Sequence, residues 1–199
     1  MTKRERSILE IIFANKRLTP ESIKSLINGL EKNEITYDQV LKSLPKMQTI
    51  ISYFNELDYQ AITISKILEI SITRNASAEQ IITINKTFIN NNYSKLEAQQ
   101  IEGIYPRVFK EMGAETLDKK LTLYNNAGVK EDILDKPRRL KQSLCISYSR
   151  FEMLSRRNIS LKNGVLFMTE LQFKDKFGYW DQDLLKSYPI ENSKYYIKK

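Results

Sequence analysis

The chain has 199 residues, of which 41% are hydrophobic, enough to build a packed core and too many for a disordered chain. It contains no histidine and one cysteine, which excludes Ser-His-Asp triads, histidine metal ligands, internal disulfides and multi-cysteine zinc or iron–sulfur sites. The 32 Lys+Arg against 24 Asp+Glu give a formal net charge of +8, which favours a polyanionic partner.

The first predicted element is an amphipathic helix near the N-terminus. Residues 1–6 are rich in basic residues and 7–13 are mostly apolar, but Glu5 and Glu10 interrupt this signal-peptide-like pattern and the apolar stretch is short. The sequence contains no run of about 18 apolar residues, so it predicts no transmembrane helix. We therefore expect a cytoplasmic protein, with an organelle matrix such as the mitochondrial one as the alternative.

Helix-start signals recur through the first half of the chain. Thr19 precedes Pro20, which is a common pairing of an N-cap with the first helical position. Three further segments have the capping-box pattern, in which a Ser or Thr is followed three residues later by Glu or Gln. These are Thr36–Gln39, Ser77–Gln80 and Ser94–Glu97. Each opens a stretch with apolar residues at helical spacing, so each predicts a helix.

Similar segments repeat at intervals of 34 and 36 residues and precede new helices. They are Phe54–Tyr59, Phe88–Tyr93 and Tyr124–Val129, each with apolar ends and a polar middle that contains asparagine. Pro106 and Pro137 lie 31 residues apart. Periods of this length are typical of units of two or three short helices. We predict an all-α chain of about ten short stacked helices in one domain, with a strand pair within 62–84 as a weaker alternative.

A dense cluster of positive charge lies between residues 136 and 162. This segment contains eight bases and one acid, Glu152, so its net charge of +7 is nearly that of the whole chain. The bases are Lys136, Arg138, Arg139, Lys141, Arg150, Arg156, Arg157 and Lys162. Five are arginines, whose planar fork suits phosphate. We predict that they form a track for nucleic-acid phosphate, the alternatives being a solvated face, arginines paired with distant acids, or a membrane surface.

A motif series runs from residue 104 to residue 177. It consists of a leucine-containing helix, a glycine turn, a helix ending at proline, and a basic helix followed by two phenylalanines. The residues that form this series are Ile104–Phe109, Leu117, Lys120, Leu121, Asn126–Val129, Asp132–Leu134, Pro137, Leu140, Ser143, Leu144, Arg150–Leu154, Asn158, Ile159, Leu161, Phe173 and Phe177. In these motifs the stretch resembles the mitochondrial transcription termination factor (mTERF) family, although Ser149 stands where the family usually has proline.

The resemblance implies an α-solenoid, a single curved domain of short two- to three-helix repeats. Residues 1–103 would then be divergent N-terminal repeats, 104–177 the clearest repeats and 178–199 an aromatic C-terminal cap or tail. It also implies a concave basic face that binds double-stranded DNA or structured RNA, with a role in transcription termination or regulation, or in ribosomal RNA handling.

Together with the composition, these features predict a non-enzymatic DNA-binding or RNA-binding helical repeat protein that uses no cofactor or metal. The alternative is a scaffold of the same architecture that binds an acidic protein partner. The sequence leaves open the choice between DNA and RNA, the sequence preference and the oligomeric state.

Three smaller features allow more than one interpretation. Asp181 and Asp183 are either metal ligands or, as we favour, the acidic start of a helix. Lys119 and Lys120 either extend the basic track or lie on a plain exposed face. The C-terminal aromatic residues would close the last repeat as a hydrophobic cap, with stacking on bases as the weaker alternative. They are Tyr179, Trp180, Tyr188, Tyr195 and Tyr196.

Overall fold

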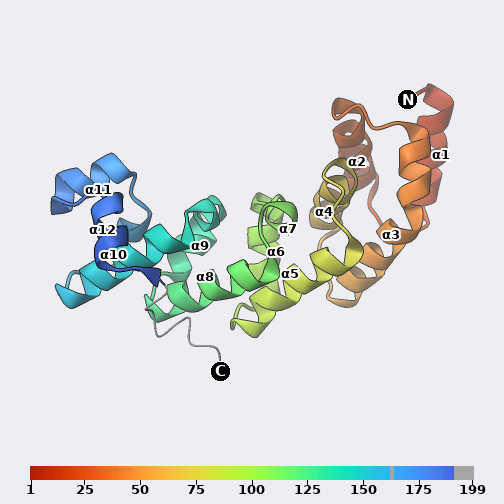
Figure 1. The fold of residues 1–199 in the computed structure, drawn as a ribbon. Helices are drawn as coiled ribbons and strands as arrows, with labels where there is room; N and C mark the ends of the chain where they lie inside the picture. Colours follow the sequence, from red (N-terminus) through yellow and green to blue (C-terminus); the bar gives the residue numbers. More distant parts are fainter. Residues whose placement is uncertain (162–163, 191–199) are drawn as a thin grey trace. The chain divides into compact units, whose positions relative to one another are not determined.

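The computed structural model describes residues 1–161 and 164–190, and across those ranges it contains helices and connecting loops with no strand (Figure 1). The all-α prediction is therefore confirmed. The chain divides into two compact units, Met1–Ala114 and Glu115–Lys199, and each is described by itself. In the described part of the chain, no helix is long and apolar enough to cross a membrane. The single domain over 1–199 stays a prediction.

Seven helices form the first unit. They are α1 (Lys3–Ala14), α2 (Pro20–Lys32), α3 (Tyr37–Glu56), α4 (Ala61–Thr73), α5 (Ala78–Asn90), α6 (Lys95–Ile104) and α7 (Val108–Glu111). Helix α4 packs against α2, α3 and α6, so it is buried around most of its circumference. This burial explains why the β-branched run in 62–84 forms α4 and α5 rather than a strand pair, because packing overrides intrinsic propensity.

The second unit contains shorter helices. They are α8 (Ala114–Asn126), α9 (Lys130–Asp135), the 3₁₀-helix η1 (Pro137–Lys141), α10 (Leu144–Arg156), the 3₁₀-helix η2 (Val165–Phe167), α11 (Glu170–Phe177) and α12 (Asp181–Ser187). Helix α10 packs against both α12 and η2. A buried cluster that includes Met153, Leu154, Phe173 and Leu184 holds this end of the unit together.

One hydrogen-bond pattern ends five of the helices. The N–H of an apolar residue donates to the carbonyl five positions earlier, at N···O distances of 2.9–3.1 Å. The residue before it has a positive φ, so each case is a Schellman motif. The segments are Leu30–Ile35, Phe54–Tyr59, Phe88–Tyr93, Tyr124–Val129 and Leu154–Ile159. The three similar segments found in the sequence are thus one helix-ending device.

The predicted helix starts are also present. Thr36 and Ser94 form complete capping boxes, in which each hydroxyl accepts an amide proton and the third helical side chain bonds back. Ser77 and Thr19 each accept an amide proton from the third helical residue. Along the chain, α5, α6 and α7 and then α8, α9 and η1 follow one order, in which two helices precede a short one next to a proline, Pro106 or Pro137.

Candidate nucleic-acid interface

The basic segment belongs entirely to the second unit. It runs from the end of α9 through η1 and α10 into the loop that follows. Seven of its eight bases are described by the structure, and Lys162 lies outside the described residues. The seven occupy three different environments, so the segment is not a uniform track.

Three bases lie exposed around η1. They are Lys136, Arg138 and Lys141. Lys136 Nζ is 3.8 Å from a carboxylate oxygen of Asp135, with both side chains about two-thirds exposed. A pair this exposed contributes little free energy, so Lys136 can exchange Asp135 for another anion.

Arg139, between them, is held inside the unit. Its Nη1 donates to the Asp132 carboxylate at 2.5 Å and to the Asp132 carbonyl at 2.9 Å. Its guanidinium lies 5.2 Å from the centre of the Phe167 ring, and its side chain is 19% exposed. Arg139 therefore joins η1 to α9 and η2, which is the internal pairing that the sequence left as an alternative.

For Arg150 the predicted surface contact is wrong. The residue is 1% exposed, and its guanidinium forms a two-pronged pair with Asp181, both N···O distances being 2.7 Å. Nη1 donates to the carbonyls of Met168 at 2.5 Å and Leu166 at 3.3 Å, and the Phe173 ring centre lies 4.4 Å away. Because its side chain is buried and makes four hydrogen bonds inside the unit, Arg150 cannot touch a phosphate.

The same pair settles the role of the two aspartates. Asp181 and Asp183 lie in the first turn of α12, as the favoured interpretation predicted. Asp181 is buried because it receives the guanidinium of Arg150. Across residues 1–161 and 164–190, no group of three or more acidic or cysteine side chains could hold a metal ion.

Arg156 and Arg157 remain at the surface, at the C-terminal end of α10. The Arg156 side chain is 66% exposed, lies 3.5 Å from a Glu152 carboxylate oxygen, and sits 4.9 Å from the centre of the Tyr188 ring. Arg157 lies 4.6 Å from the centre of the Tyr179 ring and donates to that tyrosine's hydroxyl. A helix of 13 residues is about 20 Å long, so α10 separates these two arginines from the bases around η1.

Two further cations of this region, Lys174 and Lys176, lie over aromatic rings and were not among the predicted site residues. Lys174 Nζ lies 3.7 Å from the centre of the Trp180 ring. The available signal was the alternation of lysines with aromatic residues in 173–180. We call Arg156, Arg157, Lys174, Tyr179, Trp180 and Tyr188 the cation–aromatic array. Tyr179 and Tyr188 also pack against the buried cluster, in agreement with the predicted hydrophobic cap, whereas Tyr195 and Tyr196 lie outside the described residues.

The two lysines of α8 do not continue the track together. Lys119 forms an ion pair with Glu115 at 2.6 Å, one turn away on the same helix. Lys120 is 5% exposed, and its Nζ donates to the Leu140 carbonyl at 2.6 Å. Burial lowers the pKa of Lys120 to about 8. This lysine is therefore hydrogen-bonded to the end of η1, and it is too buried to contact a ligand.

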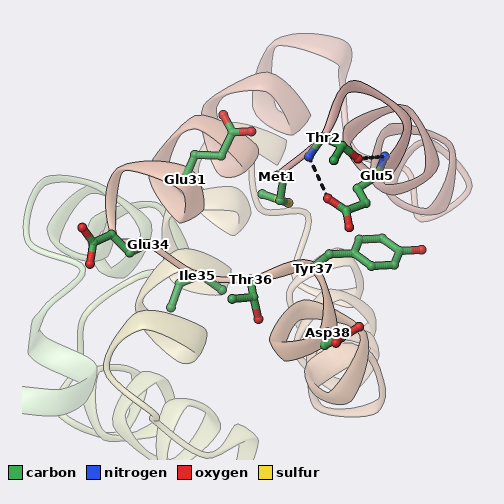
Figure 2. A pocket seen from close by; sticks show the side chains of 9 residues that line it. All are labelled: Met1, Thr2, Glu5, Glu31, Glu34, Ile35, Thr36, Tyr37 and Asp38. Atoms are coloured by element: carbon green, nitrogen blue, oxygen red, sulfur yellow. Dashed lines mark hydrogen bonds between the residues drawn. The ribbon is translucent and has the colours of Figure 1, made fainter.

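The first unit has a pocket of about 640 Å³ where α1 begins, α2 ends and α3 begins (Figure 2). Its charged lining is acidic, consisting of Glu5, Glu31, Glu34 and Asp38. Three of these have local roles. The Glu5 carboxylate accepts the Thr2 backbone N–H at 2.7 Å, which lowers its pKa. Glu31 pairs with an arginine of α1 at 3.1 Å, and Asp38 lies in the first turn of α3, where a carboxylate is stabilised.

A buried polar cluster joins α3, α5 and α6 in the first unit. The Asn85 amide donates to Glu102 Oε1 at 2.9 Å and to the Tyr59 hydroxyl at 2.6 Å, and accepts from the Tyr53 hydroxyl at 2.9 Å. Glu102 is fully buried, and its Oε2 has no hydrogen-bond partner in the described part of the chain. Burial raises the pKa of Glu102 to about 8, although bonds from Asn85 and Tyr59 oppose the shift. The carboxyl is therefore mostly protonated at neutral pH.

No known protein family, curated protein or solved structure matches this chain. Its function is therefore inferred from its own residues and their geometry.

Proposed function

We propose that the chain is a non-enzymatic nucleic-acid-binding protein that holds double-stranded DNA or structured RNA through the basic surface of its second unit. The supporting observation is that five bases of segment 136–162 are exposed, while the segment's one acid, Glu152, has a side chain only 17% exposed. The five are Lys136, Arg138, Lys141, Arg156 and Arg157. Such a surface attracts polyanions because segment 136–162 contains eight bases and one acid.

The spacing of the five bases suits an extended phosphate chain. They form two groups at opposite ends of α10, about 20 Å apart, which corresponds to roughly six nucleotides along one strand. Each phosphate contact releases condensed counterions, so five contacts give a logarithmic salt slope of about −4 to −5 on duplex DNA. Contacts of this kind position the nucleic acid without reading its sequence.

We further propose that the helices form an mTERF-like α-solenoid with a role in transcription termination or regulation, or in ribosomal RNA handling. Two features support this. The Schellman motif recurs at the ends of α2, α3, α5, α8 and α10, and the order of two helices followed by a short one beside a proline occurs twice. Repeated units of this kind stack into extended binding surfaces.

A second candidate function is an interaction scaffold whose partner is an acidic protein surface. The same exposed arginines favour it, because a guanidinium pairs with carboxylates as well as with phosphates. The two functions differ in their ligand, so one binding experiment separates them.

The test is a fluorescence-anisotropy titration of the full chain against labelled duplex DNA, an RNA hairpin and single strands over a range of salt concentrations. We expect binding to the nucleic acids with a steep negative salt slope and little sequence dependence. The charge reversals Arg138→Glu and Lys141→Glu together should weaken binding about tenfold on every sequence and reduce the slope by about 2.

The matched control reverses two exposed lysines of the first unit, Lys24→Glu and Lys86→Glu, which changes the net charge by the same amount. Equal weakening by both pairs would show that net charge alone acts, contradicting a site in the second unit. Absence of binding at low salt to every nucleic acid would overturn the proposed function and leave the acidic-partner scaffold.

A further inference from the structure

The three cations of the cation–aromatic array each lie over an aromatic ring. We propose that this array binds unpaired bases of a single-stranded segment, with Trp180 as the surface on which a base stacks. The inference rests on the proposed function and deepens it, because it names the part of the nucleic acid that this end of the second unit recognises.

The array consists of three cation–ring pairs. Arg157 lies 4.6 Å from the centre of the Tyr179 ring, and the next residue along the chain is Trp180. Lys174 Nζ lies 3.7 Å from the centre of the Trp180 ring. The third pair is Arg156 with the Tyr188 ring, at 4.9 Å, and its arginine directly precedes Arg157 in the chain. The three pairs therefore connect the C-terminal end of α10 and helix α11 to the residues on either side of α12.

Trp180 differs from the two tyrosines. Tyr179 and Tyr188 pack against the buried cluster around Phe173, so their rings contribute to the core of the unit. Trp180 is instead 39% exposed and is one of the large apolar side chains left at the surface. Trp180 therefore leaves apolar ring surface in contact with solvent, and a ligand that covers this surface gains the free energy of burying it.

The chemistry of the array suits unpaired bases. Every base has a flat π-face that stacks on an aromatic ring whatever its sequence, and nearby cations neutralise the phosphates that connect successive bases. In a duplex the bases already stack on one another, so a duplex can use the cations but not the Trp180 ring. The array should therefore favour single strands, whereas the bases around η1 contact phosphates of either form.

Trp180 is the only tryptophan in the sequence, so its fluorescence reports on this site alone. The full chain is titrated with oligothymidylate of about 15 nucleotides, with a duplex of the same length, and with base-free polyphosphate. Excitation is set where tyrosine does not absorb. We expect saturable quenching by the single strand, over the concentrations at which anisotropy shows binding. The duplex should quench less, and polyphosphate should leave the emission unchanged.

Substitutions give an independent readout. Trp180→Ala should weaken oligothymidylate binding about tenfold and change duplex binding less than twofold, while Trp180→Phe should keep most of the affinity. The matched control is Leu171→Ala, which truncates a 61% exposed apolar residue of α11 and should change neither affinity. Circular dichroism before the titrations verifies that each variant is folded.

Three results would overturn the inference. If single strands bind with unchanged Trp180 emission and Trp180→Ala behaves like Leu171→Ala, the array does not stack bases, although the proposed function stands. If polyphosphate or polyglutamate quenches as strongly as oligothymidylate, the site recognises negative charge only. If no nucleic acid binds in the anisotropy titration, the proposed function fails, and the inference fails with it.

Discussion

Glu102 is a carboxyl group that the first unit buries without a counter-ion. Its partners Asn85 and Tyr59 are uncharged side chains, and among the described residues it forms no ion pair. An ionised carboxylate in that place would be poorly solvated, so the folded chain keeps the proton. The pKa is about 8 in the folded state against the ordinary 4.5, and the folded chain therefore binds more protons than the unfolded chain between these values.

From this difference we predict that the first unit loses stability as the pH rises from about 4.5 to about 8. The loss is on the order of a few kcal/mol, because each unit of pKa difference corresponds to about 1.4 kcal/mol. Glu102→Gln has no proton to lose and should flatten the profile, whereas exposed Glu79→Gln should leave it unchanged. Urea unfolding followed by circular dichroism across that pH range measures the effect. A profile as steep in Glu102→Gln as in the parent chain would contradict it.

At the scale of elements, Arg150 and Asp181 connect α10 to α12. The same guanidinium also donates to two carbonyls around η2, so three elements meet at one side chain. Such a pair adds little to stability relative to well-packed apolar residues, but removing one partner leaves a buried charge uncompensated. The pair therefore affects the free energy of unfolding most when one partner is removed, because the other partner is then a buried charge without a counter-charge.

We predict that Asp181→Asn destabilises the second unit by about 3–5 kcal/mol, because it leaves the buried Arg150 charge without a counter-charge. Asp183→Asn, an exposed change in the same helical turn, should cost less than about 1 kcal/mol. Replacing both partners, Arg150→Met with Asp181→Leu, should recover most of the loss. The free energy of unfolding by urea, followed through Trp180 emission, measures all three. Equal losses in the two single variants would show that the pair does not stabilise the fold.

Helix starts and ends could be predicted because their signals are local. The Thr36 and Ser94 caps and the Schellman segments each involve residues at most five positions apart, so the sequence contains the complete interaction. Arg150 could not be placed in the same way, since its partner lies 31 positions further along the chain. Its charge in a basic run suggested the surface, and only the packing of α10 on α12 reveals that it is buried.

The same limit applies to the other site residues. Exposure of Arg138, Arg156 and Arg157 agrees with the charge count, but the sequence did not indicate that Arg139 pairs with Asp132 or that Lys120 lies beneath η1. Polar residues on an amphipathic pattern are expected to face solvent, and each of these exceptions depends on a neighbouring helix. The sequence therefore showed how many basic residues the segment contains, but it did not show which of them are exposed to a ligand.

For the whole molecule, positive charge is unevenly divided between the units. Counted over the sequence, residues 1–114 carry a net charge of +2 and residues 115–199 carry +6. We therefore expect a polyanion to be attracted mainly to the second unit, over a Debye length of about 10 Å at 0.1 M salt. The first unit has its acidic pocket and its buried carboxyl, so the two units differ in their response to pH as well as to anions.

The second unit should respond to pH in the opposite direction. Lys120 has a pKa of about 8 in the folded state against the ordinary 10.5, because burial penalises its charge. Between these values the unfolded chain binds more protons, so stability rises with pH. We predict that the urea midpoint reported by Trp180 emission increases from about pH 8 to about pH 10.5.

The variants isolate this lysine. Lys120→Met should abolish the increase, because it replaces the ammonium by an uncharged side chain, whereas Lys119→Met, on the partly exposed neighbour, should retain it. A midpoint that falls over this range in the parent chain, or an equal response in the two variants, would show that Lys120 does not control the stability of the second unit. The Glu102 effect lowers stability as the pH rises toward about 8 and the Lys120 effect raises it above about 8, so the two effects have opposite signs and the single variants separate them.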